Sequence, residues 1–209
     1  MAGAAGWWGD AHAAPAAAKH RLLVMGDSLS AEYGIAKGSG WVALATQRMA
    51  AKGMSVEVTN ASVSGETTSG GRARLPALLE AHRPTHVVIE LGANDALRGL
   101  SLTQARANLQ AMIDASRHSG AKVLLIGMMV PPNFGRRYSE SFAAMFTDLA
   151  RDAHVALVPF LLKGVADRPD AQDWFQPDHL HPLAKAHPLI LDNVWPALSA
   201  LLLGRQARP

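Results

Sequence analysis

One serine stands where a buried strand is expected to end. The aliphatic segment 21–26, RLLVMG, runs directly into Asp27, Ser28 and Leu29. Ser28 can be interpreted as the cap of a following helix, the commoner role of an isolated serine in such a place. It can also be interpreted as a nucleophile, because open α/β sheets place ligands at the carboxyl ends of their strands. Only the remaining polar residues can decide between these two interpretations.

Asp178 and His181 could provide what a serine nucleophile needs. A serine hydroxyl attacks a carbonyl only when a base removes its proton, and histidine has a pKa suited to that task. A carboxylate bonded to the other ring nitrogen fixes the tautomer of the imidazole. The two residues are three apart in one proline-bounded turn, so they can reach each other locally. Taken alone, this pair is more typical of a surface turn.

The oxyanion of acyl transfer needs hydrogen-bond donors, and three groups could supply them. They are the backbone N–H groups of Ser28 and Gly65 and the side-chain amide of Asn94. Gly65 and Asn94 are by default turn residues, although glycine also allows a substrate to approach the backbone closely. Together, the four polar segments favour a serine nucleophile with its base, carboxylate and oxyanion donors over four unrelated turns.

The elements that must position these residues alternate along the chain. Short runs rich in Val, Ile and Leu predict parallel strands at 21–26, 55–60, 86–91, 122–128 and 155–160. Helical spacing predicts helices at 40–52, 70–82, 102–120, 136–153 and 182–203, the last bent or broken near Pro188 and Pro196. The alternation predicts an α/β fold, a doubly wound three-layer sandwich around a five-stranded parallel sheet. The polar segments then meet at one rim.

Composition limits the remaining possibilities. The 209 residues are 49% hydrophobic and 18% charged, which is typical of a folded domain, expected here over 21–209. Residues 1–20 are expected to be a flexible leader or the remnant of a signal peptide, since the sequence AHA at 11–13 resembles a signal-peptidase site. The net charge of +3 is scattered, which argues against nucleic-acid binding. No segment has the length of an integral membrane helix, and without cysteine a thiolate nucleophile is excluded.

Four ordered blocks resemble the SGNH (GDSL-type) hydrolase superfamily. They are GDSLS with Ser28, NASVSGETTSGG with Gly65, ELGANDALRG with Asn94, and DHLHP with Asp178 and His181. The segments RLPALL at 74–79 and FGRRYSESF at 134–142 extend the resemblance to the bacterial multifunctional thioesterase/lysophospholipase/arylesterase branch. The resemblance covers roughly residues 21–203.

The resemblance implies a flavodoxin-like α/β/α hydrolase fold and the family's mechanism. Ser28 would form an acyl-enzyme, His181 would act as base and then acid, and Asp178 would orient His181, with Ser28, Gly65 and Asn94 as the oxyanion hole. The expected partner is a small acyl ester or thioester, such as an aryl ester, an acyl-CoA or a lysophospholipid, and no cofactor is needed. The expected location is periplasmic or secreted, otherwise cytoplasmic, and the expected state a monomer or small homo-oligomer.

Several alternatives remain open. The same catalytic set would serve a carbohydrate acetylesterase, and a binding module or a flavodoxin-like nucleotide binder could use the same loops. His179 raises the idea of a metal site with Asp178 and His181, but the fourth block already explains two of these residues, so no metal is predicted. His187 adds a further imidazole of unassigned role.

Residues for contact with substrate are expected around the nucleophile and in two loops. Leu97, Leu100 and Leu102 could cover an acyl chain, with Met128, Met129, Pro131 and Phe134 as the opposite wall. The two neighbours of the serine, Asp27 and Leu29, are further candidates.

Overall fold

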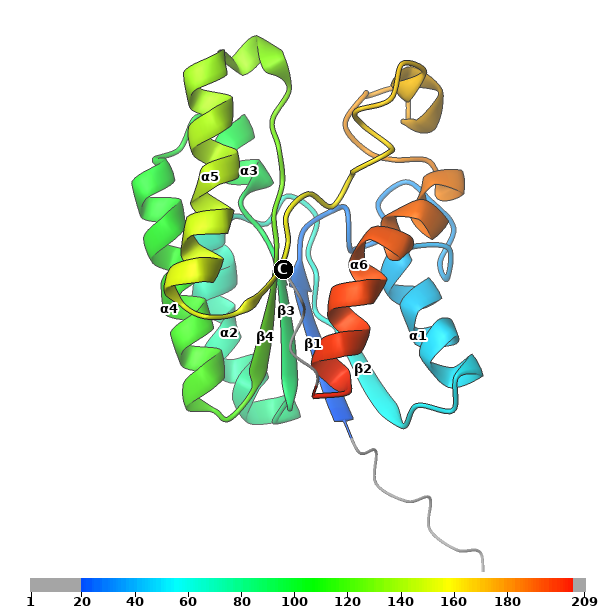
Figure 1. Cartoon of the computed structure of the whole chain (residues 1–209), viewed down its shortest axis with the longest axis vertical. Coiled ribbons are helices and arrows are strands. Elements are labelled where there is room, and N and C mark those ends of the chain that lie inside the picture. Colours follow the sequence, from blue (N-terminus) through cyan, green and yellow to red (C-terminus); the bar gives the residue numbers. More distant parts are fainter. Residues whose placement is uncertain (1–19, 205–209) are drawn as a thin grey trace, which may run out of the picture.

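Five aliphatic segments pair into a parallel sheet at the centre of the molecule (Figure 1). A computed structural model describes residues 20–204. The strands are β1 (His20–Gly26), β2 (Val56–Asn60), β3 (His86–Glu90), β4 (Lys122–Ile126) and β5 (Ala156–Val158). Their order is β2-β1-β3-β4-β5, and every neighbouring pair is parallel. This confirms the predicted five-stranded parallel sheet, in the order of flavodoxin-like folds.

Burial on both faces explains why these segments read as continuous aliphatic runs. Residues 22–25 of β1 and all of β3 are buried. The side chains of an inner parallel strand meet helices on both sides, so no polar alternation is tolerated there. The edge strand β2, with the sequence VEVTN, is only partly buried and does alternate. The sequence pattern therefore distinguishes the inner strands from the edge strand β2.

Helices cover both faces of the sheet and complete three layers (Figure 1). The helices α1 and α6 pack together on one face, while α2, α4 and α5 lie on the other. Their bounds are α1 (Trp41–Ala51), α2 (Thr68–His82), α4 (Leu102–His118), α5 (Arg136–Asp152) and α6 (His187–Leu202). The predicted three-layer α/β/α architecture is confirmed.

One short helix was not predicted. α3 (Ala93–Leu97) follows β3 in a segment expected to be a loop. Five residues are too few to display a helical period, so the polar and glycine content of this segment dominated the prediction. Helix α3 matters for function because it carries Asn94.

The start of the last helix also differs from the prediction. α6 begins at His187 rather than at residue 182, after a 3-10 turn over Ala184–Ala186. Pro188 lies in its first turn, where a missing N–H is no loss, and the helix continues past Pro196. The predicted break at these prolines is therefore absent.

The polar segments of the sequence lie beyond the carboxyl ends of the strands. They occupy the connections that follow β1, β2 and β3 and the long segment between β5 and α6. Among residues 20–204 no helix is both long and apolar enough to cross a membrane. Residues 1–19 lie outside the described part of the chain, so the division into a leader and one domain over 21–209 stays a prediction.

His187 joins the two helices of one layer. Helix α1 begins after Gly40, which has no side chain to cap it. The Nδ1 atom of the buried His187 instead accepts a hydrogen bond from the backbone N–H of Trp41 at 3.1 Å. Burial lowers the pKa of His187, which keeps the ring neutral and Nδ1 free to accept. His187 is thus a structural residue that caps a helix from elsewhere in the chain.

We expect His187→Ala to lower the free energy of unfolding by ~1–2 kcal/mol, the usual effect of losing a helix cap. His187→Asn should recover part of this loss, because its side-chain oxygen can accept from the same N–H. Urea unfolding followed by circular dichroism measures both variants. Equal stability of His187→Ala and the wild type would contradict the capping role.

Candidate active site

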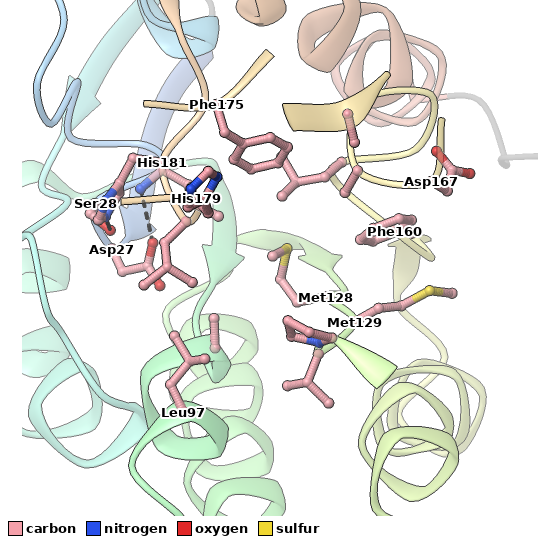
Figure 2. Close-up of a pocket in the computed structure, with 18 of the residues that line it drawn as sticks. Asp27, Ser28, Leu97, Met128, Met129, Phe160, Asp167, Phe175, His179 and His181 are labelled. Carbon is pink, nitrogen blue, oxygen red and sulfur yellow. Dashed lines mark hydrogen bonds between the residues drawn. The ribbon is translucent and has the colours of Figure 1, made fainter. Parts of the chain in front are cut away.

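Ser28, His181 and Asp178 form one chain of contacts at the carboxyl edge of the sheet. Figure 2 shows Ser28 beside His181. The Nε2 atom of His181 lies 2.8 Å from the Oγ of Ser28. The Nδ1 atom of His181 lies 2.7 Å from Oδ2 of Asp178. With its proton on Nδ1, the imidazole donates to Asp178 and can accept the serine proton at Nε2. The geometry therefore suits the transfer of a proton from serine to histidine.

The Asp178 carboxylate is held in its charged form. Burial by itself raises its pKa, but hydrogen bonds from the His181 ring and from the backbone N–H groups of His181 and Leu180 outweigh that effect. The pKa of Asp178 falls to about 2. Its Oδ1 accepts both backbone bonds at 3.0 Å, which fixes the turn and leaves Oδ2 for the ring. Asp178 can thus orient the imidazole throughout the neutral pH range.

The backbone N–H groups of two candidate oxyanion-hole residues have no hydrogen-bond partner among residues 20–204. They belong to Ser28 and Gly65, neither of which donates a backbone hydrogen bond there. Gly65 has a φ of 78°, a conformation that strains any residue with a Cβ atom. Free N–H groups near a serine hydroxyl are what an oxyanion hole requires.

Arg98 holds the Gly65 turn in place. Its Nη2 atom donates to the carbonyl oxygen of Gly65 at 2.8 Å, and it follows directly after α3. This contact could not be predicted, because the sequence around an exposed arginine in a loop does not indicate which residue it binds. Helix α3 thereby positions two parts of the candidate oxyanion hole, Asn94 within it and Gly65 through Arg98.

The amide of Asn94 is oriented by Asp27. Asn94 Nδ2 donates to Asp27 Oδ2 at 3.0 Å, and Asp27 Oδ1 accepts from the backbone N–H of Leu29 at 3.0 Å. Burial raises the pKa of Asp27 to about 6, although those hydrogen bonds and the charge on His181 oppose the rise. An ionised Asp27 fixes Nδ2 as the donor end of the amide, which leaves its second hydrogen for a substrate oxyanion.

Glu90 is a second buried carboxyl group beneath the serine. Its Oε2 atom accepts from Ser30 Oγ at 2.7 Å and from the backbone N–H of Asp27 at 3.3 Å. Its Oε1 atom has no partner in the described structure. Burial, and then the negative charge of Asp27, raise the pKa of Glu90 well above its usual value. The aliphatic pattern places Glu90 only in a strand, although a charged residue at the end of an aliphatic run is a signal of a functional group.

A pocket of about 490 Å³ opens beside Ser28 and is lined mainly by apolar side chains (Figure 2). Ser28 and His181 lie at one side of it, and Met129 and Asp167 at the other. The volume is within the range of small-molecule sites. Its apolar lining includes Leu29, Leu97, Met128, Met129, Val130, Pro131, Phe160, Leu162 and Phe175. The pocket can therefore hold a hydrocarbon chain whose carbonyl lies at the serine.

The predicted substrate contacts agree with this pocket only in part. Of the nine expected positions, six line it, namely Asp27, Leu29, Leu97, Met128, Met129 and Pro131. Leu100, Leu102 and Phe134 do not. Leu100 is half-exposed beyond the left-handed Gly99, which turns the chain away after α3.

Phe134 instead belongs to a separate, more open groove. Its ring stacks on Tyr138 with centroids 6.2 Å apart, and Leu102 lines the same groove. Met128, Met129 and Pro131, expected in the opposite wall, do line the main pocket. The rest of its lining comes from the irregular segment after β5, including Phe160, Leu162, Ala166 and Phe175. That segment has neither a helical nor a strand period, so its place in the wall cannot be predicted from the sequence.

His179 borders the pocket but joins no group of ligands. Among the described residues no three His, Asp or Glu side chains are placed to share a metal ion. The backbone of His179 has a φ of 56°, and its N–H donates to the carbonyl of Gln176 at 2.9 Å. His179 is therefore a rim residue on a tight turn, and His187 lies in the helix layer described above.

A model of the GDSL-like Lipase/Acylhydrolase family matches residues 24–189. The chain belongs to this family. It is 49% identical to the esterase TesA of Pseudomonas aeruginosa over 186 residues. This alignment covers 89% of this chain and 91% of TesA. A crystal structure of TesA matches the fold with a TM-score of 0.83 at 48% identity, over 87% of this chain and 99% of the other.

Two further relatives support the same assignment. Thioesterase 1/protease 1/lysophospholipase L1 of Escherichia coli K12 is 41% identical over 177 residues, 85% of this chain and 82% of that protein. The crystal structure of AlinE4, an SGNH-hydrolase family esterase, has a TM-score of 0.71 at 37% identity, over 86% and 95% of the two chains. The predictions of an SGNH-type fold and of an ester and thioester hydrolase are confirmed. The carbohydrate acetylesterase alternative is not favoured.

We expect Glu90→Gln to change how stability depends on pH. Because its pKa is raised, Glu90 keeps its proton in the folded wild type at pH values above 4.5, the ordinary glutamate pKa. In the unfolded chain Glu90 loses that proton above pH 4.5. Folding of the wild type is therefore increasingly penalised as pH rises above 4.5, by up to ~1.4 kcal/mol per unit. The amide of glutamine carries no such penalty. The free energy of unfolding of the variant minus that of the wild type should increase from pH 4 to pH 7, measured by urea unfolding, and a constant difference would contradict a protonated Glu90.

Proposed function

We propose that Ser28 is the nucleophile of a serine esterase and thioesterase, with His181 as general base and Asp178 as its orienting carboxylate. The observation that carries this proposal is the continuous pair of contacts, 2.8 Å from Ser28 to His181 and 2.7 Å from His181 to Asp178, at the edge of an apolar pocket. The family supplies the reaction class, and the geometry supplies a role for each side chain.

In the first half-reaction, His181 Nε2 takes the proton of Ser28 as Oγ attacks the carbonyl carbon. The negative charge that develops on the carbonyl oxygen is stabilised by the N–H groups of Ser28 and Gly65 and by the Asn94 amide. His181 then gives the proton to the departing alcohol or thiol, and the acyl group remains on Ser28. In the second half-reaction His181 activates water, which attacks the acyl-enzyme and releases the acid.

We infer that the preferred substrates carry an acyl chain longer than acetyl. The pocket lining is mostly aliphatic and aromatic, and burying each methylene of a chain there contributes about 0.8 kcal/mol. Aryl esters, acyl-CoA thioesters and lysophospholipids all offer such a chain, and their leaving groups differ widely. An acetylated sugar would leave most of this apolar surface in contact with water.

The site of action is proposed to be the periplasm or the outside of the cell, with the cytoplasm as the alternative. The alanine-rich leader and its AHA sequence at 11–13 support export. Whether the enzyme acts as a monomer or a small homo-oligomer stays a prediction.

The proposal is tested by treating the protein with a fluorophosphonate and measuring its intact mass. The wild type should take one label and hydrolyse p-nitrophenyl butyrate. Ser28→Ala should take none and lose about 10³-fold or more of kcat, as expected when a nucleophile is removed. A folded Ser28→Ala variant that retains wild-type activity would show that another residue performs the reaction.

The acyl pocket is tested with a matched pair of leucines. Leu97 lines the pocket, whereas Leu100 lies three residues away outside it. Leu97→Ala should change the ratio of kcat/KM between octanoyl and butyryl esters of p-nitrophenol by roughly three- to tenfold, the usual effect of changing one or two methylene contacts. Leu100→Ala should leave that ratio unchanged. Equal ratios for both variants would remove α3 from the acyl site.

A further inference from the structure

Tyr33 lies against the candidate general base. Its ring centroid is 4.4 Å from that of the His181 imidazole, with the two ring planes tilted by 40°. Tyr33 is 49% exposed and does not line the acyl pocket, whereas His181 does. The Tyr33 ring therefore contacts a side of the imidazole that does not face the pocket. Neither the family blocks of the sequence nor the contacts among Ser28, His181 and Asp178 assign it a role.

One residue ties the Tyr33 loop to the His181 turn. Gln176 Nε2 donates to the carbonyl of Tyr33 at 2.9 Å. The backbone N–H of Gln176 donates to the carbonyl of His181 at 2.7 Å. Gly34 allows this close approach, because a Cβ atom there would collide with the Gln176 side chain. Gln176 thus joins the backbone that carries the Tyr33 ring to the backbone that carries the His181 ring, through its side chain and its own N–H.

The loop that presents Tyr33 is held in an unfavourable backbone conformation. Glu32 has a φ of 60°, which is uncommon for a residue with a side chain. Its carboxylate compensates by accepting from the backbone N–H groups of Gly38 and Gly40. The N–H of Tyr33 in turn donates to the carbonyl of Ser28 at 3.3 Å. The contacts of this loop thus connect it to both the nucleophile and the turn that carries the base.

The histidine and its carboxylate are open to solvent on their outer side. Their side chains are 20% and 39% exposed, so water can compete for the bond between His181 and Asp178. A neighbouring aromatic ring limits that access. A cation within about 6 Å of the face of a tyrosine ring is also stabilised by the ring quadrupole. His181 becomes such a cation in each half-reaction when it takes up a proton.

We propose that Tyr33 is a positioning residue for His181. Its ring restrains the imidazole in the line between Ser28 and Asp178, shields the bond to Asp178 from water, and stabilises the protonated imidazole during both half-reactions. This inference rests on the proposed function of Ser28 and His181. It assigns Tyr33 an effect on turnover rather than on the binding of substrate.

Three substitutions separate the aromatic ring from the hydroxyl and from general packing. Tyr33→Phe keeps the ring, and Tyr33→Leu keeps an apolar side chain but removes the ring. Trp195→Leu is the control, because it removes from helix α6, far along the chain from Tyr33, a half-buried aromatic ring that packs beside a cation, Arg48. Circular dichroism and thermal unfolding establish that each variant is folded.

With p-nitrophenyl butyrate, Tyr33→Leu should lower kcat by roughly five- to tenfold with KM unchanged within about twofold, the size expected for a partly exposed cation and ring contact. Its rate of phosphonylation by a fluorophosphonate should fall by the same factor. Tyr33→Phe and Trp195→Leu should match the wild type. In proton NMR the low-field Nδ1 proton of His181 should be retained in Tyr33→Phe and lost to exchange with water in Tyr33→Leu.

The inference is overturned if folded Tyr33→Leu turns over like the wild type. It is also overturned if only KM rises, which would make Tyr33 a substrate contact, or if Tyr33→Phe is impaired equally, which would assign the effect to the hydroxyl. Ser28→Ala measured in parallel separates this failure from failure of the proposed function. If Ser28→Ala is inactive and Tyr33→Leu is unaffected, only the role of Tyr33 is lost.

Discussion

Parallel pairing of the strands is the constraint on which the rest of the molecule depends. Hydrogen bonds between parallel strands place all five carboxyl ends at one edge, and every connection must return across a face of the sheet through a helix. The connections that follow neighbouring strands therefore start side by side at this edge, although they are far apart in the chain. Ser28 follows β1, Gly65 follows β2 and Asn94 follows β3, in the neighbouring strands β2, β1 and β3. The strand order places Ser28 between the segments that carry Gly65 and Asn94, the two candidate oxyanion donors.

Burying carboxyl groups beneath Ser28 costs stability that the sheet itself does not require. Two carboxyl groups, Asp27 and Glu90, are buried within hydrogen-bond reach of the same short turn. An aliphatic residue at position 90 would avoid a buried oxygen without a partner. Glu90, however, bonds both the backbone of Asp27 and the hydroxyl of Ser30, and Ser30 also accepts from the indole N–H of Trp41 at 3.1 Å. We infer that this part of the core is built to fix the backbone on both sides of Ser28, at some expense of stability.

The parts of the site that depend on short stretches of sequence were predictable, whereas the parts that depend on contacts between distant residues were not. The inner strands were predictable because burial on both faces demands aliphatic runs. Asp178 and His181 were predictable because they are only three positions apart. The contacts of Arg98 and Glu90 could not be predicted, because their partners, Gly65 and Ser30, lie 33 and 60 residues away in the chain. The acyl wall after β5 was missed for a different reason. This wall is built from irregular backbone. Neither the path of the chain there nor the direction of the Phe160 and Phe175 side chains follows from a helical or strand period.

His181 lies 153 residues after Ser28, and this separation has a consequence for the making of the enzyme. Synthesis runs from the N-terminus, so β1 and Ser28 exist long before the turn that carries His181. Under the proposed mechanism, a growing chain holds a serine that no imidazole can yet deprotonate. Activity then requires the segment after β5 to reach the edge of the sheet, and incomplete chains would be inactive toward esters and thioesters.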